Sequence, residues 1–138
     1  MEKSLVLIKP FAMHTGLGGA IINRLEKKGL KVVAIKMIHM DKTLAERHYA
    51  VHRDKPFFEE LVGYITSAPV MSIVFEGEGA VELIRKTMGA TDPTKAAKGT
   101  IRGDLGIDIK RNAVHGSDAA ETAEKEIKLF FAEDEIFG

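Results

Sequence analysis

The sequence predicts one α/β (α+β) domain over residues 1–138, a ferredoxin-like sandwich in which helices cover a four-stranded antiparallel sheet. The first observation is the order of the segments, β-α-β-α-α-β-α-loop-α-β, which contains two β-α-β units. The second is size and composition, because 138 residues that are 45% hydrophobic and 29% charged suit a single compact core.

The strands are predicted where short apolar or alternating runs occur. Three of these runs are rich in β-branched residues or are bounded by proline, which favours strands over helices. The fourth is an alternation of apolar side chains that follows an alanine-rich helix. The predicted strands are SLVLIKP (4–10), LKVVAIKMIHM (30–40), PVMSIVFEG (69–77) and the segment around Ile127, Leu129 and Phe131.

The helices are predicted where apolar residues recur at helical spacing between capping residues and glycine. They are TGLGGAIINRLEKKG (15–29), DKTLAERHYAVH (41–52), KPFFEELVGYITSA (55–68), GAVELIRKTMG (79–89) and the alanine-rich start of SDAAETAEKEIKLFF (117–131). The segment from Ala90 to about Arg111 is predicted to be a long irregular loop, and such loops in compact domains are usually functional or disordered.

Composition excludes several classes of protein. Twenty basic and twenty acidic residues argue against a general nucleic-acid binder but allow a local basic pocket. No apolar run is long enough to span a bilayer, and the N-terminus does not have a signal-peptide pattern. With no cysteine there is no disulfide, thiolate metal site or cysteine nucleophile, and a cytoplasmic enzyme fits.

Two familiar nucleotide motifs and one metal motif are not matched. GLGGAI has Ile21 where a dinucleotide fingerprint needs its third glycine, and no P-loop occurs. His48 and His52 are four apart and would share one face of a helix, but no HExxH surrounds them. We therefore do not expect a metal site made of protein ligands.

The stretch RNAVHGSDA (111–119) places His115 just before a predicted helix. Ser117 and Asp118 are N-cap candidates, and Glu121 completes a capping-box pattern with Asp118. The imidazole would then lie beside a helix N-terminus, which favours anions. By itself the pattern favours an ordinary turn histidine before a helix.

Three cations stand at unusual places: Lys9 at the end of an apolar strand, Arg85 before the long loop, and Arg102 inside it. With Thr91 and His115 they could form a phosphate site without a P-loop, in which His115 attacks a γ-phosphoryl group. The alternatives are a solvated lysine and an arginine paired with a carboxylate such as Asp104. Spacing alone leaves open whether these side chains converge.

RNAVHGSDA resembles the Asn-x-x-His-Gly-Ser-Asp signature of nucleoside diphosphate kinases. IKP, ERHYAVHRDKPFFEELVGYITSAPV, MGATDP and GTIRGDLG resemble the same family in the same order, to about Phe131. The resemblance implies ping-pong transfer of the γ-phosphate from a nucleoside triphosphate, mainly ATP, to a nucleoside diphosphate, with Mg²⁺ as cofactor and low base specificity. It also implies a homo-oligomer, with the choice between tetramer and hexamer left open.

The resemblance assigns His115 as the phosphorylated nucleophile and Glu126 as the partner of its other ring nitrogen. Lys9 and Tyr49 would lie near the γ-phosphate, and Lys9 and Asn112 near the ribose. The remaining contacts would come from His52, Arg85, Thr91 and Arg102 on the other phosphates, Phe57 and Ile109 on either side of the base, and Asp118 on Mg²⁺ through water.

Without the resemblance, the simpler interpretations are a core aromatic for Phe57, helix packing for Tyr49 and a solvated charge for Glu126. Phe58 fits the core face better than Phe57, so Phe57 is expected to be the exposed one. The chain departs from the family's usual residues at Phe11, Thr15, Lys98 and Ala119. None of these positions has a proposed chemical role.

Two other functions are considered. The same fold could be a catalytically silent nucleotide-binding or regulatory module, although the full set of implied site residues argues against it. A specific nucleic-acid binder is disfavoured by the net charge of zero and by the lack of an aromatic RNA-binding signature. The expected partners are nucleoside di- and triphosphates, and no membrane is expected.

Overall fold

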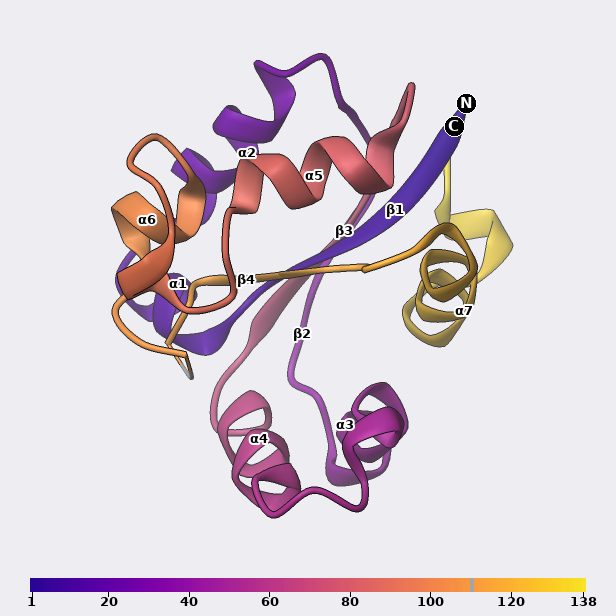
Figure 1. Ribbon diagram of the computed structural model, residues 1–138. Coiled ribbons are helices and arrows are strands. Elements are labelled where there is room, and N and C mark those ends of the chain that lie inside the picture. The colour runs from indigo at the N-terminus through magenta and orange to yellow at the C-terminus, as the bar shows by residue number, and fades with distance from the viewer. Residues whose placement is uncertain (110) are drawn as a thin grey trace.

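The computed structural model describes residues 1–109 and 111–138. Its sheet has the strand order β2-β3-β1-β4, and each neighbouring pair is antiparallel, as predicted. The strands cross the middle of the molecule in Figure 1, with β1 and β3 at the centre of the sheet. Their bounds are Glu2–Ile8 for β1, Lys31–Ile38 for β2, Val70–Gly77 for β3 and Val114–Gly116 for β4.

Helices pack on both faces of this sheet, which confirms the sandwich (Figure 1). The α-helices are α1 (Pro10–His14), α2 (Gly18–Glu26), α3 (Lys42–His48), α4 (Phe58–Ile65), α5 (Ala80–Met88), α6 (Ile101–Leu105) and α7 (Ala120–Phe130). Short 3₁₀ turns are η1 (Ala50–His52), η2 (Pro93–Lys95) and η3 (Glu133–Glu135). Among the described residues no helix is both long and apolar enough to cross a membrane.

The two cores follow from the alternation of side chains along β1, where successive residues point to opposite faces. Leu5 and Leu7 pack with α3, α4 and α7, whereas Val6 and Ile8 pack with α1, α2, α5 and α6. All four side chains are fully buried. Because both faces of β1 are covered, the strand is a rigid base for the segment that follows it.

The prediction of a strand around Ile127, Leu129 and Phe131 was wrong. This segment continues α7 to Phe130, and the fourth strand, β4, lies earlier, beside β1. The segment forms a helix rather than a strand because its buried residues recur at a spacing of three and four, as on one face of a helix. These residues are Ala123, Glu126, Ile127 and Phe130. The apparent alternation combined that helical stripe with the extended residue after the helix.

The capping prediction at HGSD was also wrong. The residue before α7 is Ala119, whose side chain makes no capping bond, and the capping box of Asp118 and Glu121 does not form. Ser117 is instead fully buried and its hydroxyl donates to Glu126. A polar side chain that was interpreted as a helix cap therefore belongs to an internal contact.

Two helices were not predicted. Pro10 ends the first strand as expected, but it is also the first residue of α1, a position where its missing N–H is not needed. The segment from Ala90 to Arg111 holds η2 and α6, so it is less irregular than predicted. Thr100 caps α6 by accepting a hydrogen bond from the backbone N–H of Gly103 at 3.1 Å.

Gly103 provides a test of how α6 is held. A Cβ added there would overlap the carbonyl oxygen of Ala97, which belongs to backbone and cannot swing aside. We expect Gly103→Ala to lower the free energy of unfolding by about 1–3 kcal/mol, measured by urea denaturation. Gly63→Ala is the matched control, because a Cβ there meets nothing within 4 Å. It lies inside α4, so it should be neutral or slightly stabilising. Equal losses in both variants would contradict this account.

Candidate active site

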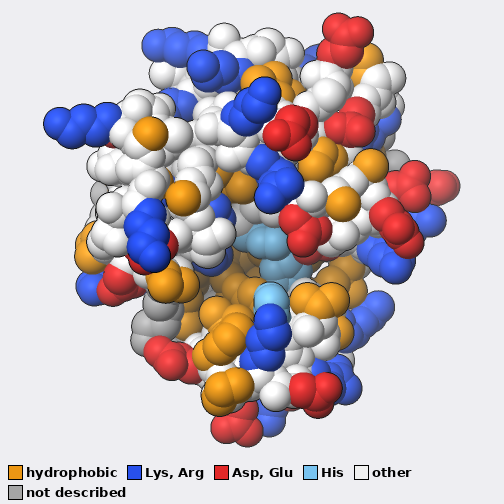
Figure 2. Space-filling view, viewed as in Figure 1, with side chains coloured by type: hydrophobic (Ala, Val, Ile, Leu, Met, Phe, Trp, Pro, Cys, Tyr) orange, Lys and Arg blue, Asp and Glu red, His pale blue; other side chains and the backbone are white. Residues whose placement is uncertain are grey.

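A cavity of about 860 Å³ opens between α3, the α5 end and α7, beside β4. In Figure 2 it is a hollow in the middle of the face, with pale-blue histidines at its floor and Lys and Arg side chains around it. The structure places every residue proposed above for the site in its lining: Lys9, Tyr49, His52, Phe57, Arg85, Thr91, Arg102, Ile109, Asn112, His115, Asp118 and Glu126. The basic side chains that were scattered in sequence are therefore gathered at one place, although the net charge is zero.

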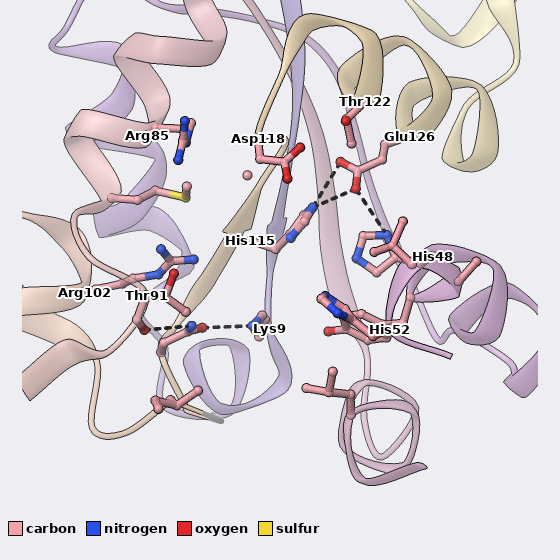
Figure 3. Close-up of a pocket in the computed structure, with 18 of the residues that line it drawn as sticks. Lys9, His48, His52, Arg85, Thr91, Arg102, His115, Asp118, Thr122 and Glu126 are labelled. Atoms are coloured by element: carbon pink, nitrogen blue, oxygen red, sulfur yellow. Dashed lines mark hydrogen bonds and ion pairs between the residues drawn. The ribbon is translucent and has the colours of Figure 1, made fainter. Parts of the chain in front are cut away.

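His115 lies on β4 and is held from the side of α7 (Figure 3). Its Nε2 lies 3.1 Å from both carboxylate oxygens of Glu126, and the Ser117 hydroxyl donates to Glu126 at 2.6 Å. Burial would raise the pKa of Glu126, but the hydrogen bond and charge of His115 together with the Ser117 bond outweigh it and lower the pKa. The carboxylate is therefore ionised, and it places the imidazole proton on Nε2.

Lys9 is buried at the end of β1, next to the cavity. Its Nζ donates to the Asn112 side-chain oxygen at 2.9 Å, and the Asn112 amide donates to the Thr91 carbonyl at 3.2 Å. Burial, and then the charge of Arg102, lower the pKa of Lys9 to about 7. A solvated strand-end lysine, the simpler alternative, is thus not what the structure has.

Arg102 does not pair with Asp104, which instead accepts a hydrogen bond from Arg24 at 2.7 Å. The Arg102 guanidinium donates to the carbonyl oxygens of Gly89 at 3.1 Å and Val114 at 2.9 Å. Burial lowers its pKa to about 10, so it remains a cation at neutral pH. Its buried Nε has no hydrogen-bond partner among the described residues, which leaves a donor available for an anion.

Ala113 connects Asn112 to β4 with a positive φ of 78°. Residues with a side chain adopt this conformation at a cost, and such strain gathers at functional sites. The Ala113 carbonyl accepts a hydrogen bond from the Lys9 backbone N–H at 3.0 Å. The turn therefore fixes the Asn112 and Lys9 segments against each other.

The opposite wall comes from α3 and η1. The two histidines interpreted as a single helical face belong to different elements, because α3 ends at His48 and Tyr49 leads into η1. Burial raises the pKa of Tyr49 well above its ordinary value, so its phenol stays a neutral donor. Burial, and then the charge of Lys55, lower the pKa of His52.

His48 is one of the lining residues that sequence reasoning did not place in the site. It is 9% exposed, its ring packs edge-on against that of His115 at 4.6 Å between centroids, and its Nδ1 lies 3.7 Å from Glu126 Oε2. Burial and the charge of His115 lower the pKa of His48 to about 3. The sequence did offer one indication that His48 belongs to the site, because it is adjacent to Tyr49. A helix end that contributes one residue to a site can also contribute the residue next to it.

Two apolar side chains stand at the mouth of the cavity. Phe57 is 42% exposed and Ile109 is 60% exposed, whereas Phe58 packs against the core. This confirms the expectation that Phe57 is the exposed member of the pair. An exposed aromatic at a cationic cavity can stack on a planar ring of a ligand.

Comparison with known proteins gives a consistent result over nearly the whole chain. The family model described as "Nucleoside diphosphate kinase" matches residues 2–136. Nucleoside diphosphate kinase from one strain of Dehalococcoides mccartyi is 58% identical over 99% of this chain and 96% of the relative. The enzyme of that name from Archaeoglobus fulgidus is 54% identical over 99% of this chain and 90% of the relative.

Solved structures agree. The structure of a halophilic nucleoside diphosphate kinase from Halobacterium salinarum in complex with CDP has a TM-score of 0.97 at 50% identity, covering 99% of this chain and 91% of that one. The nucleoside diphosphate kinase of Aquifex aeolicus has a TM-score of 0.95 at 40% identity, with 98% of each chain covered.

Proposed function

Since the chain belongs to the nucleoside diphosphate kinase family, we propose that its phosphotransferase reaction runs through a phosphohistidine at His115. The observation that carries this proposal is the contact of His115 Nε2 with the Glu126 carboxylate at 3.1 Å. It leaves Nδ1 without the proton, and a neutral imidazole nitrogen with a free lone pair is a nucleophile.

The proposed first half-reaction forms one bond and breaks one. The Nδ1 lone pair of His115 forms the N–P bond to the γ-phosphorus, the bond from phosphorus to the β,γ-bridging oxygen breaks, and the nucleoside diphosphate leaves with that electron pair. The Nε2 proton stays on the ring, and the positive charge that develops there is balanced by Glu126. In the second half-reaction a terminal oxygen of another nucleoside diphosphate forms a bond to the same phosphorus, the N–P bond breaks, and its electron pair returns to Nδ1 of His115.

The cationic wall would stabilise the charge of the phosphates during both steps. Arg102 offers its unpartnered Nε, and Arg85 is exposed toward the cavity opposite His115 (Figure 3). Thr91 and His52 would complete the phosphate contacts, while Tyr49 would donate near the γ-phosphate. Lys9 and Asn112, hydrogen-bonded to each other, would serve the ribose hydroxyls, with Lys9 also near the γ-phosphate.

The residues present also fit Mg²⁺. Asp118 is an exposed carboxylate in the cavity lining, whereas Glu126 lies beside the nitrogen donors of His115 and His48, which Mg²⁺ does not favour. Magnesium prefers one or two carboxylates, waters and substrate phosphates rather than a cage of protein ligands. We propose that Asp118 holds Mg²⁺ through water, and that the ion, when bound, neutralises phosphate charge.

The direct test of this function is incubation of the protein with γ-labelled ATP and Mg²⁺. A label on the protein that is lost in acid, stable in base and passed to an added nucleoside diphosphate supports the proposal. The same test separates the silent binding module, which would bind ATP but acquire no label. The intact His115–Glu126 contact favours turnover over that alternative.

Phe57→Ala is expected to weaken nucleotide binding by about 1–3 kcal/mol, because a base would lose its stacking surface. Purine and pyrimidine nucleotides should be affected in the same direction, since every base has a π-face; the CDP complex of the Halobacterium salinarum relative supports a site that takes a pyrimidine. Isothermal titration with ADP and CDP measures the change. Phe137→Ala, at an exposed phenylalanine outside the cavity lining, is the control. If the Phe57→Ala variant is unfolded, the Phe57 ring stabilises the fold and its role in stacking on the base is contradicted.

The lowered pKa of Lys9 predicts that the protein takes up a proton when a nucleotide binds. With its pKa near 7 in the free protein, Lys9 would be about nine-tenths neutral at pH 8. Phosphate anions favour the charged form and raise the pKa, so binding at pH 8 should take up close to one proton. Titration calorimetry in two buffers of different ionisation enthalpy measures the uptake, and Lys9→Met should remove it. Absence of uptake in the unmodified protein would contradict the buried, neutral Lys9.

We also propose that the chain forms a homo-oligomer. The support is the edge strand β2, on which Ile35 and Met37 are 48% and 60% exposed. Exposed apolar side chains on an edge strand are a common route to association.

A further inference from the structure

We propose that His48, His115 and Glu126 form a binding site for a divalent transition-metal ion of the Zn²⁺ type, and that the bound ion holds His115 in its inactive tautomer. One donor atom from each of the three residues lies within 4.8 Å of the other two. Two imidazoles and a carboxylate form a donor set that Zn²⁺ takes in proteins with an open fourth position. The site is distinct from the proposed Mg²⁺ contact at Asp118, because Mg²⁺ prefers oxygen ligands.

The distances suit a small ion. Ligands around a tetrahedral Zn²⁺ with bonds of about 2.0–2.1 Å lie about 3.3–3.4 Å apart. The contact of His115 Nε2 with Glu126 is 3.1 Å, and that of His48 Nδ1 with Glu126 Oε2 is 3.7 Å. Figure 3 shows the Glu126 carboxylate between the two rings, with dashed contacts to both. Two of the three donor–donor distances are thus near the required length, and the donor atoms of His48 and His115 lie within 4.8 Å of each other.

His48 is the independent sign that this cluster can receive a ligand. Its side chain is 1% exposed, yet neither ring nitrogen has a hydrogen-bond partner among the described residues. Buried polar groups are nearly always paired, so an unpaired imidazole aimed at a carboxylate calls for an explanation. A metal ion would use the Nδ1 lone pair while the His48 proton resides on Nε2. The ion can reach the site because the His115 side chain, 24% exposed, lines the open cavity.

Metal binding would change which nitrogen of His115 carries the proton. In the metal-free protein the proton is on Nε2, bonded to Glu126. The ion takes the Nε2 lone pair, and the single proton of the neutral ring moves to Nδ1, so no net proton is gained or lost. Nδ1–H has no lone pair for phosphorus. The blocking effect rests on the function proposed above, whereas the metal site and the tautomer change do not.

The test uses the nucleotide-free protein. Titration with Co²⁺, a spectroscopic substitute for Zn²⁺, should give the visible bands of a four-coordinate ion at one Co²⁺ per chain, and Zn²⁺ should displace it. His48→Gln and Glu126→Gln should each weaken binding at least about 100-fold, since loss of a direct ligand costs no less than loss of an outer partner. His52→Gln, a histidine of the same cavity outside the cluster, should change the affinity no more than about two-fold.

Histidine nitrogen NMR supplies a second measurement. On addition of Zn²⁺, His115 Nδ1 should change from the unprotonated to the protonated type. Absence of four-coordinate Co²⁺ bands, or wild-type affinity in folded His48→Gln, would overturn the proposal; if His48→Gln does not fold, wild-type affinity in Glu126→Gln overturns it equally. Neither measurement needs phosphotransfer, so a protein that failed to form phosphohistidine would leave this test unaffected.

Discussion

Replacing His115 by alanine is expected to abolish phosphotransfer, with the turnover rate falling by at least about 10⁴-fold. The variant has no nitrogen at the position that faces the γ-phosphorus, and among the described residues His115 is the only histidine of the cavity lining that is hydrogen-bonded to a carboxylate. Phosphoenzyme should be undetectable after incubation with γ-labelled ATP.

Nucleotide affinity should remain nearly intact in the same variant. The proposed phosphate and base contacts come from other elements, such as Arg102 on α6 and Phe57 before α4. Titration calorimetry with ADP measures this, and His14→Ala, at an exposed histidine outside the cavity, is the control for loss of a histidine elsewhere. Substantial ping-pong turnover by His115→Ala would contradict the assignment of the nucleophile.

The sequence was sufficient to predict the helices and strands whose burial can be inferred from their own residues alone. Strands β2 and β3 and helices α2 to α5 lie within the predicted segments, and β1 overlaps its segment but begins two residues earlier, at Glu2. These elements could be predicted because β-branched runs and amphipathic stripes are visible in the local sequence. The errors fall where two patterns compete. At Ile127–Phe131 a helical stripe produced an alternation of apolar residues, and β4 is only three residues long, too short for any periodic signal.

The site shows the same division. Motifs predicted which side chains to examine, but convergence of Lys9, Arg102 and His115 depends on the sheet order, which no residue spacing contains. Ser117 was interpreted as a helix cap because short polar residues before a helix usually have that role. Its burial against Glu126 is a tertiary contact, and so is the unpaired state of His48.

The contribution of Glu126 to the rate of phosphotransfer can be separated from its contribution to nucleotide affinity. Glu126→Gln keeps the size of the side chain and can still accept the hydrogen bond from His115 Nε2, but it loses the charge that balances the ring as the N–P bond forms. Because its own amide can also donate, the glutamine no longer selects one tautomer of His115. We expect the rate of His115 phosphorylation to fall by roughly one to two powers of ten, with nucleotide affinity almost unchanged.

Stopped-flow measurement of phosphoenzyme formation, beside a direct binding titration, distinguishes these two effects. Glu126→Ala should cost at least as much as Glu126→Gln, because it removes the hydrogen bond as well as the charge. Glu124→Gln is the matched control: the same substitution at an exposed position of α7, which should leave both quantities unchanged.

Because the Ser117 hydroxyl donates to Glu126 at 2.6 Å, Ser117→Ala should slow phosphorylation by a smaller factor than Glu126→Gln. An unaltered phosphorylation rate in both Glu126 variants would return this residue to the simpler interpretation, a helix charge without a part in the chemistry.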